Sequence, residues 1–152
     1  MILTRQISTV VAAPREHVAA LLVRTDLDTL RFYDPRVESV ETNGLPDGAV
    51  GQVVRMTGRV WGQEVEMVQT TLEAEPPERF LDRMQMPGDA LLTQTWLIDL
   101  ENGSTRMDQT VSFEIAPWKV LKIAATALTA SAQLRKAAAR FAELAELGYR
   151  PA

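Results

Sequence analysis

Residues 104–115, STRMDQTVSFEI, alternate apolar and polar side chains, and residues 117–147, PWKVLKIAATALTASAQLRKAAARFAELAEL, follow almost directly. The first stretch has the two-residue period of a half-buried strand, and the second has the three- and four-residue spacing of an amphipathic helix. Each has an apolar face that needs a covering partner. The junction therefore predicts a sheet whose one face is covered by a long helix.

The chain upstream of this junction predicts antiparallel strands joined by short turns. Asn102-Gly103 has the composition of a tight hairpin turn, and a second turn is expected at Trp61-Gly62. The order of elements indicates an α+β fold, in which two short helices follow the first strand and a long helix ends the chain. Strands are expected at 2–12, 36–42, 50–60, 63–73, 79–86, 91–100 and 104–115, and the short helices at 13–23 and 25–33.

Hairpin register predicts which side chains face the helix. A two-residue turn at Asn102-Gly103 sets Trp96 opposite Gln109 on the inner face of the sheet. When the same alternation of inward and outward side chains is extended through the other hairpins, methionines and further glutamines also fall on the inner face. These residues suit an adaptable cavity better than a packed core. The expected ligand-binding residues are Met56, Met67, Gln69, Met84, Gln94, Trp96, Met107, Gln109 and Phe113 from the strands, and Leu128 from the long helix.

Two polar residues of this inner face carry specific hypotheses. Gln109 interrupts an apolar face, and burying an amide without a partner costs about 1–3 kcal/mol. It is therefore either satisfied inside a core or lines a space that something polar enters. Asp82 is the candidate catalytic residue, because a carboxyl in an apolar cavity has a raised pKa and can act as an acid or a base. The alternative is an outward Asp82 paired with Arg79 or Arg106.

Composition excludes several function classes. The chain has 152 residues, a net charge of −4, no cysteine and one histidine, His17. Without a basic stripe, nucleic acid is not an expected partner, and without cysteine or a second histidine no metal site or catalytic triad is expected. No apolar run is long enough for a membrane span, and no glycine-rich phosphate motif indicates a cofactor. We expect a single cytoplasmic domain over residues 1–152.

Three segments, in this order and spacing, resemble the START-like superfamily, and within it the polyketide cyclase/dehydrase-like group. They are VAAPREHVAALL (11–22), LEAEPPERFLDRM (72–84) and WLIDLENGSTRMDQTVSFEI (96–115), the last of which precedes the long helix. The resemblance implies a helix-grip fold, in which a curved antiparallel sheet of about seven strands wraps around the C-terminal helix and leaves an internal cavity. It implies binding of apolar small molecules, and it does not fix a reaction.

Three functions remain open from the sequence. The first is binding of a small apolar molecule, lipid-, polyketide- or aromatic-like, in the internal cavity. The second is a cyclase/dehydrase-like enzyme that uses polar groups of the cavity, above all Asp82, for acid–base catalysis. The third is a protein-interaction module whose interior is filled by side chains. The scarcity of inward titratable groups favours the binder, while the sequence leaves catalysis, ligand identity and oligomeric state undecided.

Overall fold

A computed structural model describes residues 1–148 as one seven-stranded antiparallel sheet with three helices on one of its faces. The strands lie in the order β1-β7-β6-β5-β4-β3-β2. The elements along the chain are β1 (Ile2–Val11), α1 (Arg15–Leu22), α2 (Leu27–Tyr33), β2 (Val37–Thr42), β3 (Val53–Val60), β4 (Gln63–Glu75), β5 (Arg79–Met86), β6 (Asp89–Asp99), β7 (Thr105–Ile115) and α3 (Val120–Gly148).

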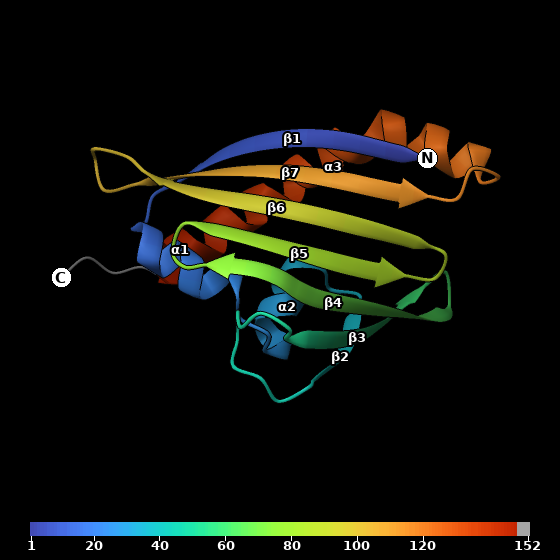
Figure 1. The fold of residues 1–152 in the computed structure, drawn as a ribbon, viewed down its shortest axis with the longest axis horizontal. Helices are drawn as coiled ribbons and strands as arrows, with labels where there is room; N and C mark the ends of the chain where they lie inside the picture. The colour runs from blue at the N-terminus through green and yellow to red at the C-terminus, as the bar shows by residue number, and fades with distance from the viewer. Residues whose placement is uncertain (149–152) are drawn as a thin grey trace.

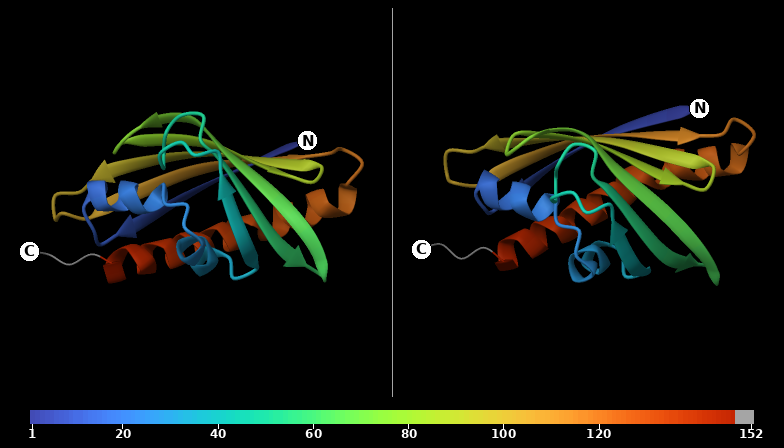
Figure 2. Two further views of the ribbon diagram at one scale, coloured as in Figure 1. Left: turned by 90° about the horizontal axis from the view of Figure 1, so that it is seen from below. Right: turned by 60° about the horizontal axis from the view of Figure 1, so that its bottom comes forward.

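The sheet bends over α3, which runs obliquely beneath it, and α1 and α2 lie on the same side (Figures 1 and 2). The expected α+β helix-grip architecture is confirmed, including the seven strands, the two short helices and the long terminal helix. Proline and acidic residues begin the short helices. Pro14 precedes α1 in an extended conformation, and the side chain of Asp26 caps α2 by accepting from the backbone N–H of Thr29.

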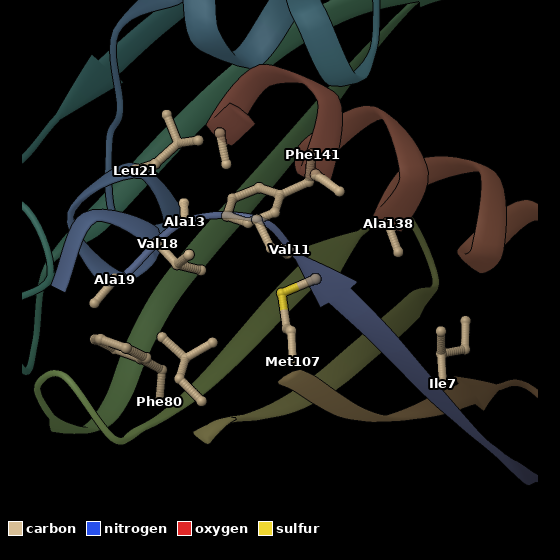
Figure 3. Close-up of a cluster of buried hydrophobic side chains, with 13 residues drawn as sticks. Ile7, Val11, Ala13, Val18, Ala19, Leu21, Phe80, Met107, Ala138 and Phe141 are labelled. Carbon is tan, nitrogen blue, oxygen red and sulfur yellow. The ribbon is translucent and has the colours of Figure 1, made fainter. Parts of the chain in front are cut away.

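The main core lies where α1 and the second half of α3 meet β1, β6 and β7. Phe141 of α3 points toward Val11, Ala13 and Val18, with Met107 of β7 beneath it (Figure 3). Alanines at 138, 142 and 145 are buried beside Phe141, and their small size lets the helix approach the sheet closely. A separate cluster of Val37, Val54 and Met56 lies under β2 and β3.

The β3–β4 hairpin has the predicted register. Trp61 and Gly62 both have positive φ, 55° and 75°, as a two-residue primed turn requires. Val54 consequently faces Gln69 across the ladder. In the next hairpin Gln69 faces Met84 and Thr71 faces Asp82, so the inward positions of β5 are also as predicted, although the ladder has an irregularity between Thr71 and Glu73.

The β6–β7 hairpin differs from the prediction by one residue. The turn contains three residues, Glu101 to Gly103, because the N–H of Leu100 donates to the Ser104 carbonyl and only Gly103 takes positive φ, 80°. A three-residue loop with a left-handed glycine is the next most common hairpin connection. Trp96 therefore pairs with Asp108 instead of Gln109, which turns every side chain of β6 to the opposite face from the one expected.

Candidate functional site

The inner face of β3, β4 and β5 forms one wall of a cavity of about 230 Å³. The opposite wall comes from the end of α1, from α2 and from the segment that leads into β3. Most of the lining is apolar. The apolar lining residues are Leu22, Val23, Leu30, Val37, Val54, Met56, Met67, Phe80 and Met84, and the polar ones are Arg24, Thr25, Asp34, Gln52, Gln69, Thr71 and Asp82, with Gly48.

Strand register places the polar groups of this cavity next to one another. Thr71 of β4 lies opposite Asp82 of β5, and two residues further along Gln69 lies opposite Met84. Because side chains alternate along a strand, all four point to the same face. The sequence prediction brought Met56, Met67, Gln69, Asp82 and Met84 to one surface, and the structure places all five in this cavity.

Asp82 lies inside the cavity, as expected, and not on the outer face. Burial raises the pKa of its carboxyl, while hydrogen bonds from the Thr71 and Gln69 side chains act in the opposite direction and offset only part of the rise. The outward alternative fails because its partners are engaged elsewhere. Arg79 pairs with Glu73 and Glu75, and Arg106 pairs with Asp108.

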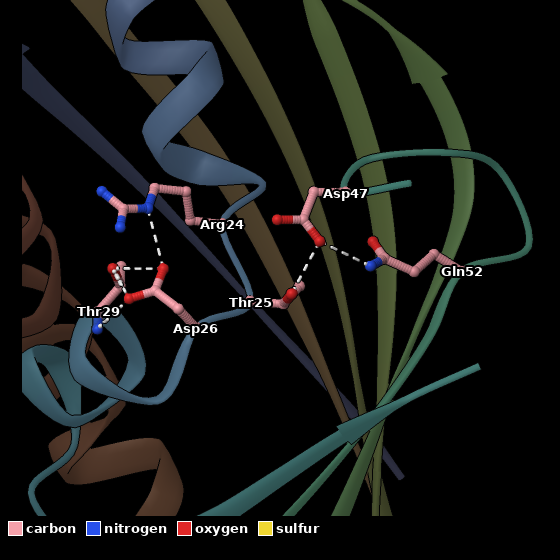
Figure 4. A network of polar contacts seen from close by, with 6 residues as sticks. All are labelled: Arg24, Thr25, Asp26, Thr29, Asp47 and Gln52. Atoms are coloured by element: carbon pink, nitrogen blue, oxygen red, sulfur yellow. Dashed lines mark hydrogen bonds and ion pairs between the residues drawn. The ribbon is translucent and has the colours of Figure 1, made fainter. Parts of the chain in front are cut away.

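A polar network fixes the rim of the cavity between α1 and α2 (Figure 4). Asp47, in the loop between β2 and β3, accepts hydrogen bonds from the Thr25 hydroxyl at 2.7 Å and from the Gln52 amide at 3.0 Å. Gln52 in turn accepts from the backbone N–H of Gly48 at 2.9 Å. A Cβ at residue 48 would lie 2.8 Å from the Val23 side chain, so glycine is needed for this close approach.

A second cavity, of about 260 Å³, lies between β6, β7 and α3. It contains two more predicted residues, Met107 and Gln109. The Gln109 amide donates to the Thr95 hydroxyl across a long 3.4 Å contact, and Thr95 is almost fully buried. Both alternatives stated for Gln109 therefore hold in part. Its amide has a hydrogen-bond partner within the protein, and its side chain also lines a cavity. Leu22 of α1 contacts both cavities and stands at their shared boundary.

Four predicted ligand-binding residues lie outside these cavities. The register of β6 turns Gln94 and Trp96 to the outer face, where Trp96 is 44% exposed and its ring stacks with the Arg79 guanidinium at 5.6 Å. The prediction that Gln94 and Trp96 face the helix is therefore wrong. Leu128 is also misplaced, since it is 85% exposed on α3. Phe113 is half-buried on the inner face, but it lines neither cavity.

The residues that close the cavity from outside the sheet were not predicted from the sequence. Arg24, Thr25 and Gln52 lie in connecting segments, where no periodicity predicts direction, and the partners Thr25 and Asp47 are 22 residues apart. Leu22 carried a helical signal, but only the packing of α1 shows that it separates two voids. Within residues 1–148, no three His, Asp or Glu side chains converge in a way that would hold a metal ion. The same residues contain no helix with the length and apolar character needed to cross a bilayer.

Comparison with known proteins gives one family match and many structural neighbours. The model of the family described as "Polyketide cyclase / dehydrase and lipid transport" matches residues 4–146. No curated protein sequence matches the chain.

Three solved structures illustrate the shared fold. The Zhui aromatase/cyclase from Streptomyces sp. R1128 is 20% identical, with a TM-score of 0.70 over 99% of this chain and 97% of that one. Norcoclaurine synthase from Thalictrum flavum, in complex with dopamine and hydroxybenzaldehyde, is 17% identical, with a TM-score of 0.66 over 99% and 90%. Ara h 8.0201 is 12% identical, with a TM-score of 0.67 over 93% and 98%. At these identities the likeness concerns the fold.

Proposed function

Because this chain belongs to the polyketide cyclase / dehydrase and lipid transport family, we propose that it binds a small apolar molecule in the cavity beneath β3, β4 and β5. The cavity volume, about 230 Å³, equals the space of about eight water molecules. Its lining combines apolar walls with a few convergent polar groups, which is the usual composition of a ligand pocket. The cavity beneath β3, β4 and β5 also disfavours the third hypothesis, a module whose interior is filled by side chains.

The observation that carries this proposal is the Asp82 carboxyl, which lies on the sheet wall of a largely apolar cavity. Asp82, with Gln69 and Thr71 beside it, offers oxygen acceptors to whatever enters. A ligand with a flat or branched apolar body and one hydroxyl group would satisfy both parts of the lining. Relatives of this fold fit such a ligand: norcoclaurine synthase was solved with dopamine and hydroxybenzaldehyde, both small aromatic compounds with hydroxyl groups.

A matched pair of probes tests this proposal. We expect the protein to bind 2-naphthol about tenfold more tightly than 2-methylnaphthalene, because one hydrogen bond to a charged or polar acceptor contributes about 1.4 kcal/mol. In Asp82→Leu the preference for the hydroxyl should disappear while 2-methylnaphthalene still binds. Titration calorimetry measures both affinities. Failure of both compounds to bind would contradict the proposed cavity function, and an unchanged preference in Asp82→Leu would contradict the role of Asp82.

A second candidate function is proton transfer catalysed by Asp82. The observation that favours it is the raised pKa of a carboxyl that reaches the cavity, since a general base works best with a pKa near the working pH. In this reaction the Asp82 carboxylate removes a proton from the carbon next to a ligand carbonyl, and the Gln69 amide donates to the resulting enolate oxygen.

Deuterium exchange distinguishes the enzyme from the binder. In D2O we expect the protein to accelerate exchange of the hydrogens next to the carbonyl of 2-tetralone, followed by NMR, and Asp82→Asn to abolish the acceleration. Binding of 2-tetralone without faster exchange would leave ligand binding as the function and exclude this proton transfer.

A further inference from the structure

The outer surface of the first half of α3 carries large apolar side chains that contact no other part of the described chain extensively. Leu121 is 88% exposed and Leu128 is 85% exposed. At 100° per residue, these two leucines and the alanines at 125 and 132 fall on one line along the helix, opposite to the buried Ala130. Trp118, two residues before the helix begins, is 81% exposed at the same end. We call Trp118, Leu121, Ala125, Leu128 and Ala132 the α3 face.

The segment that bears the α3 face is also the most positively charged part of the chain. Residues 117–140 contain five of the 16 Lys and Arg residues and none of the 20 Asp and Glu residues. This segment therefore carries a charge of +5 in a chain whose net charge is −4, which leaves −9 on the remainder. Such separation of charge is not needed for packing, because the basic residues 122, 135 and 136 lie on the exposed side of the helix.

The contacts at the start of α3 leave a positive excess there. Lys119 and Lys122 both pair with one carboxylate, that of Asp89, which is 4% exposed. Two ammonium groups against one carboxylate leave one unit of positive charge, and half of the Lys122 side chain is accessible to solvent. Further along the same helix, Arg135 and Lys136 are exposed beside the apolar line.

We propose that the α3 face docks the protein onto an anionic lipid surface. Helices that lie in a membrane interface combine exposed Leu and Trp with Lys and Arg at their flanks, and binding adds apolar burial to attraction by anionic headgroups. An indole is suited to that boundary because one edge is polar and the rest is apolar. The interaction is with the membrane surface only, and it does not depend on whether the internal cavity holds a ligand.

Charge argues against the two other occupants of this surface. A second copy of the chain would bring two basic segments together within a Debye length of about 10 Å, where like charges repel. A neutral apolar partner would bury the α3 face but would give the basic residues no counter-charge. An anionic surface satisfies both features at once.

Vesicle sedimentation tests the proposal. We expect the full chain to bind vesicles of phosphatidylcholine with 30% phosphatidylserine at least tenfold more tightly than vesicles of phosphatidylcholine alone, and 0.5 M NaCl to remove most of the difference. Leu121→Asp with Leu128→Asp should reduce binding to the anionic vesicles at least tenfold. Both sites are exposed, so the double variant should keep the circular dichroism spectrum and melting temperature of the parent.

A matched control lies on the same helix. Leu147 is 67% exposed near the acidic end of α3, next to Glu146 and one turn after Glu143, and Leu147→Asp should leave vesicle binding unchanged. Fluorescence identifies the contact directly. In Trp61→Phe with Trp96→Phe, Trp118 is the only tryptophan, and its emission should shift to the blue on anionic vesicles.

Three results would overturn the proposal. The first is equal sedimentation of the parent and the Leu121→Asp, Leu128→Asp variant. The second is binding without a blue shift of Trp118, because another surface would then make the contact. The third is a dimer in analytical ultracentrifugation that the double variant dissociates, because the α3 face would then join two copies of the chain.

Discussion

At the scale of single residues, Asp82 connects stability to pH in the direction opposite to most carboxylates. Its folded-state pKa lies above the ordinary value, because burial outweighs the hydrogen bonds from Thr71 and Gln69. Ionisation is therefore harder in the folded protein than in the unfolded chain. The destabilisation is absent at pH 3, where Asp82 is protonated in both states, and it develops as the pH rises above about 4.

Asp82→Asn should consequently melt at a higher temperature than the parent at pH 7 and at nearly the same temperature at pH 3. The amide keeps the size of the carboxyl and removes only the charge, so the difference isolates ionisation. Differential scanning calorimetry from pH 3 to pH 8 measures it. A variant that is equally or less stable than the parent at pH 7 would show that the carboxylate is well compensated in the folded state.

Gln109 and Thr95 form the second residue-scale test. Gln109→Leu should cost about 1 kcal/mol of unfolding free energy, because the buried Thr95 hydroxyl loses its amide partner. Adding Thr95→Val removes the stranded hydroxyl as well and should recover most of the loss. Urea unfolding of both single variants and the double variant gives the coupling energy. Additive losses would mean that the 3.4 Å contact contributes nothing.

At the scale of elements, the start of α3 depends on a carboxylate from the sheet. The first turn of α3 has no acidic residue. Lys119 and Lys122 place positive charge next to the positive end of the helix dipole, which is unfavourable. Asp89 of β6 supplies the missing negative charge and is buried between the two lysines. This pair of contacts holds the helix to the end of the sheet that lies farthest from the main core.

Asp89→Ala should lower the unfolding free energy by about 1–2 kcal/mol and should speed hydrogen exchange in the first two turns of α3 more than in its last turns. Asp99→Ala is the matched control on the other end of β6, because Asp99 is exposed and its ion pair with Arg15 contributes little. Hydrogen exchange measured by mass spectrometry reports each segment. Uniform exchange along α3 in Asp89→Ala would contradict a local anchor.

Elements were predictable from the sequence, and one register was not. Alternation and helical spacing predicted every strand and helix because burial of one face imposes a period on the side chains. The predicted length of the turn at residues 101–103 was wrong. Asn-Gly is typical of a two-residue loop, but the same glycine also fits a three-residue loop, and the two loops differ in register by one position. That position decides the face of Trp96 and Gln94. The cavity rim was unpredictable because Thr25, Asp47 and Gln52 meet only after the fold has formed.

At the scale of the whole molecule, Leu22 divides the interior space. It borders both the 230 Å³ cavity and the 260 Å³ cavity. Leu22→Ala should join them, so that 1-hydroxypyrene binds at least tenfold more tightly than to the parent while 2-naphthol affinity changes little. Leu21→Ala is the control, because Leu21 is buried in the main core and lines neither cavity. Equal effects of the two variants on 1-hydroxypyrene, measured by fluorescence titration, would mean that Leu22 does not limit ligand size.

The pairing of β1 with β7 has a consequence for how the chain folds. Thr4 and Ser112 are hydrogen-bonded although 108 positions separate them, whereas β3, β4 and β5 are joined by short connections. Closing a long loop costs more entropy than closing a short one, so the hairpins from β3 to β5 can form early and β1 must wait. During synthesis on the ribosome, β1 therefore stays without β7, its neighbour in the sheet, until β7 has emerged. For that interval its exposed edge and apolar side chains are available to chaperones or to other nascent chains.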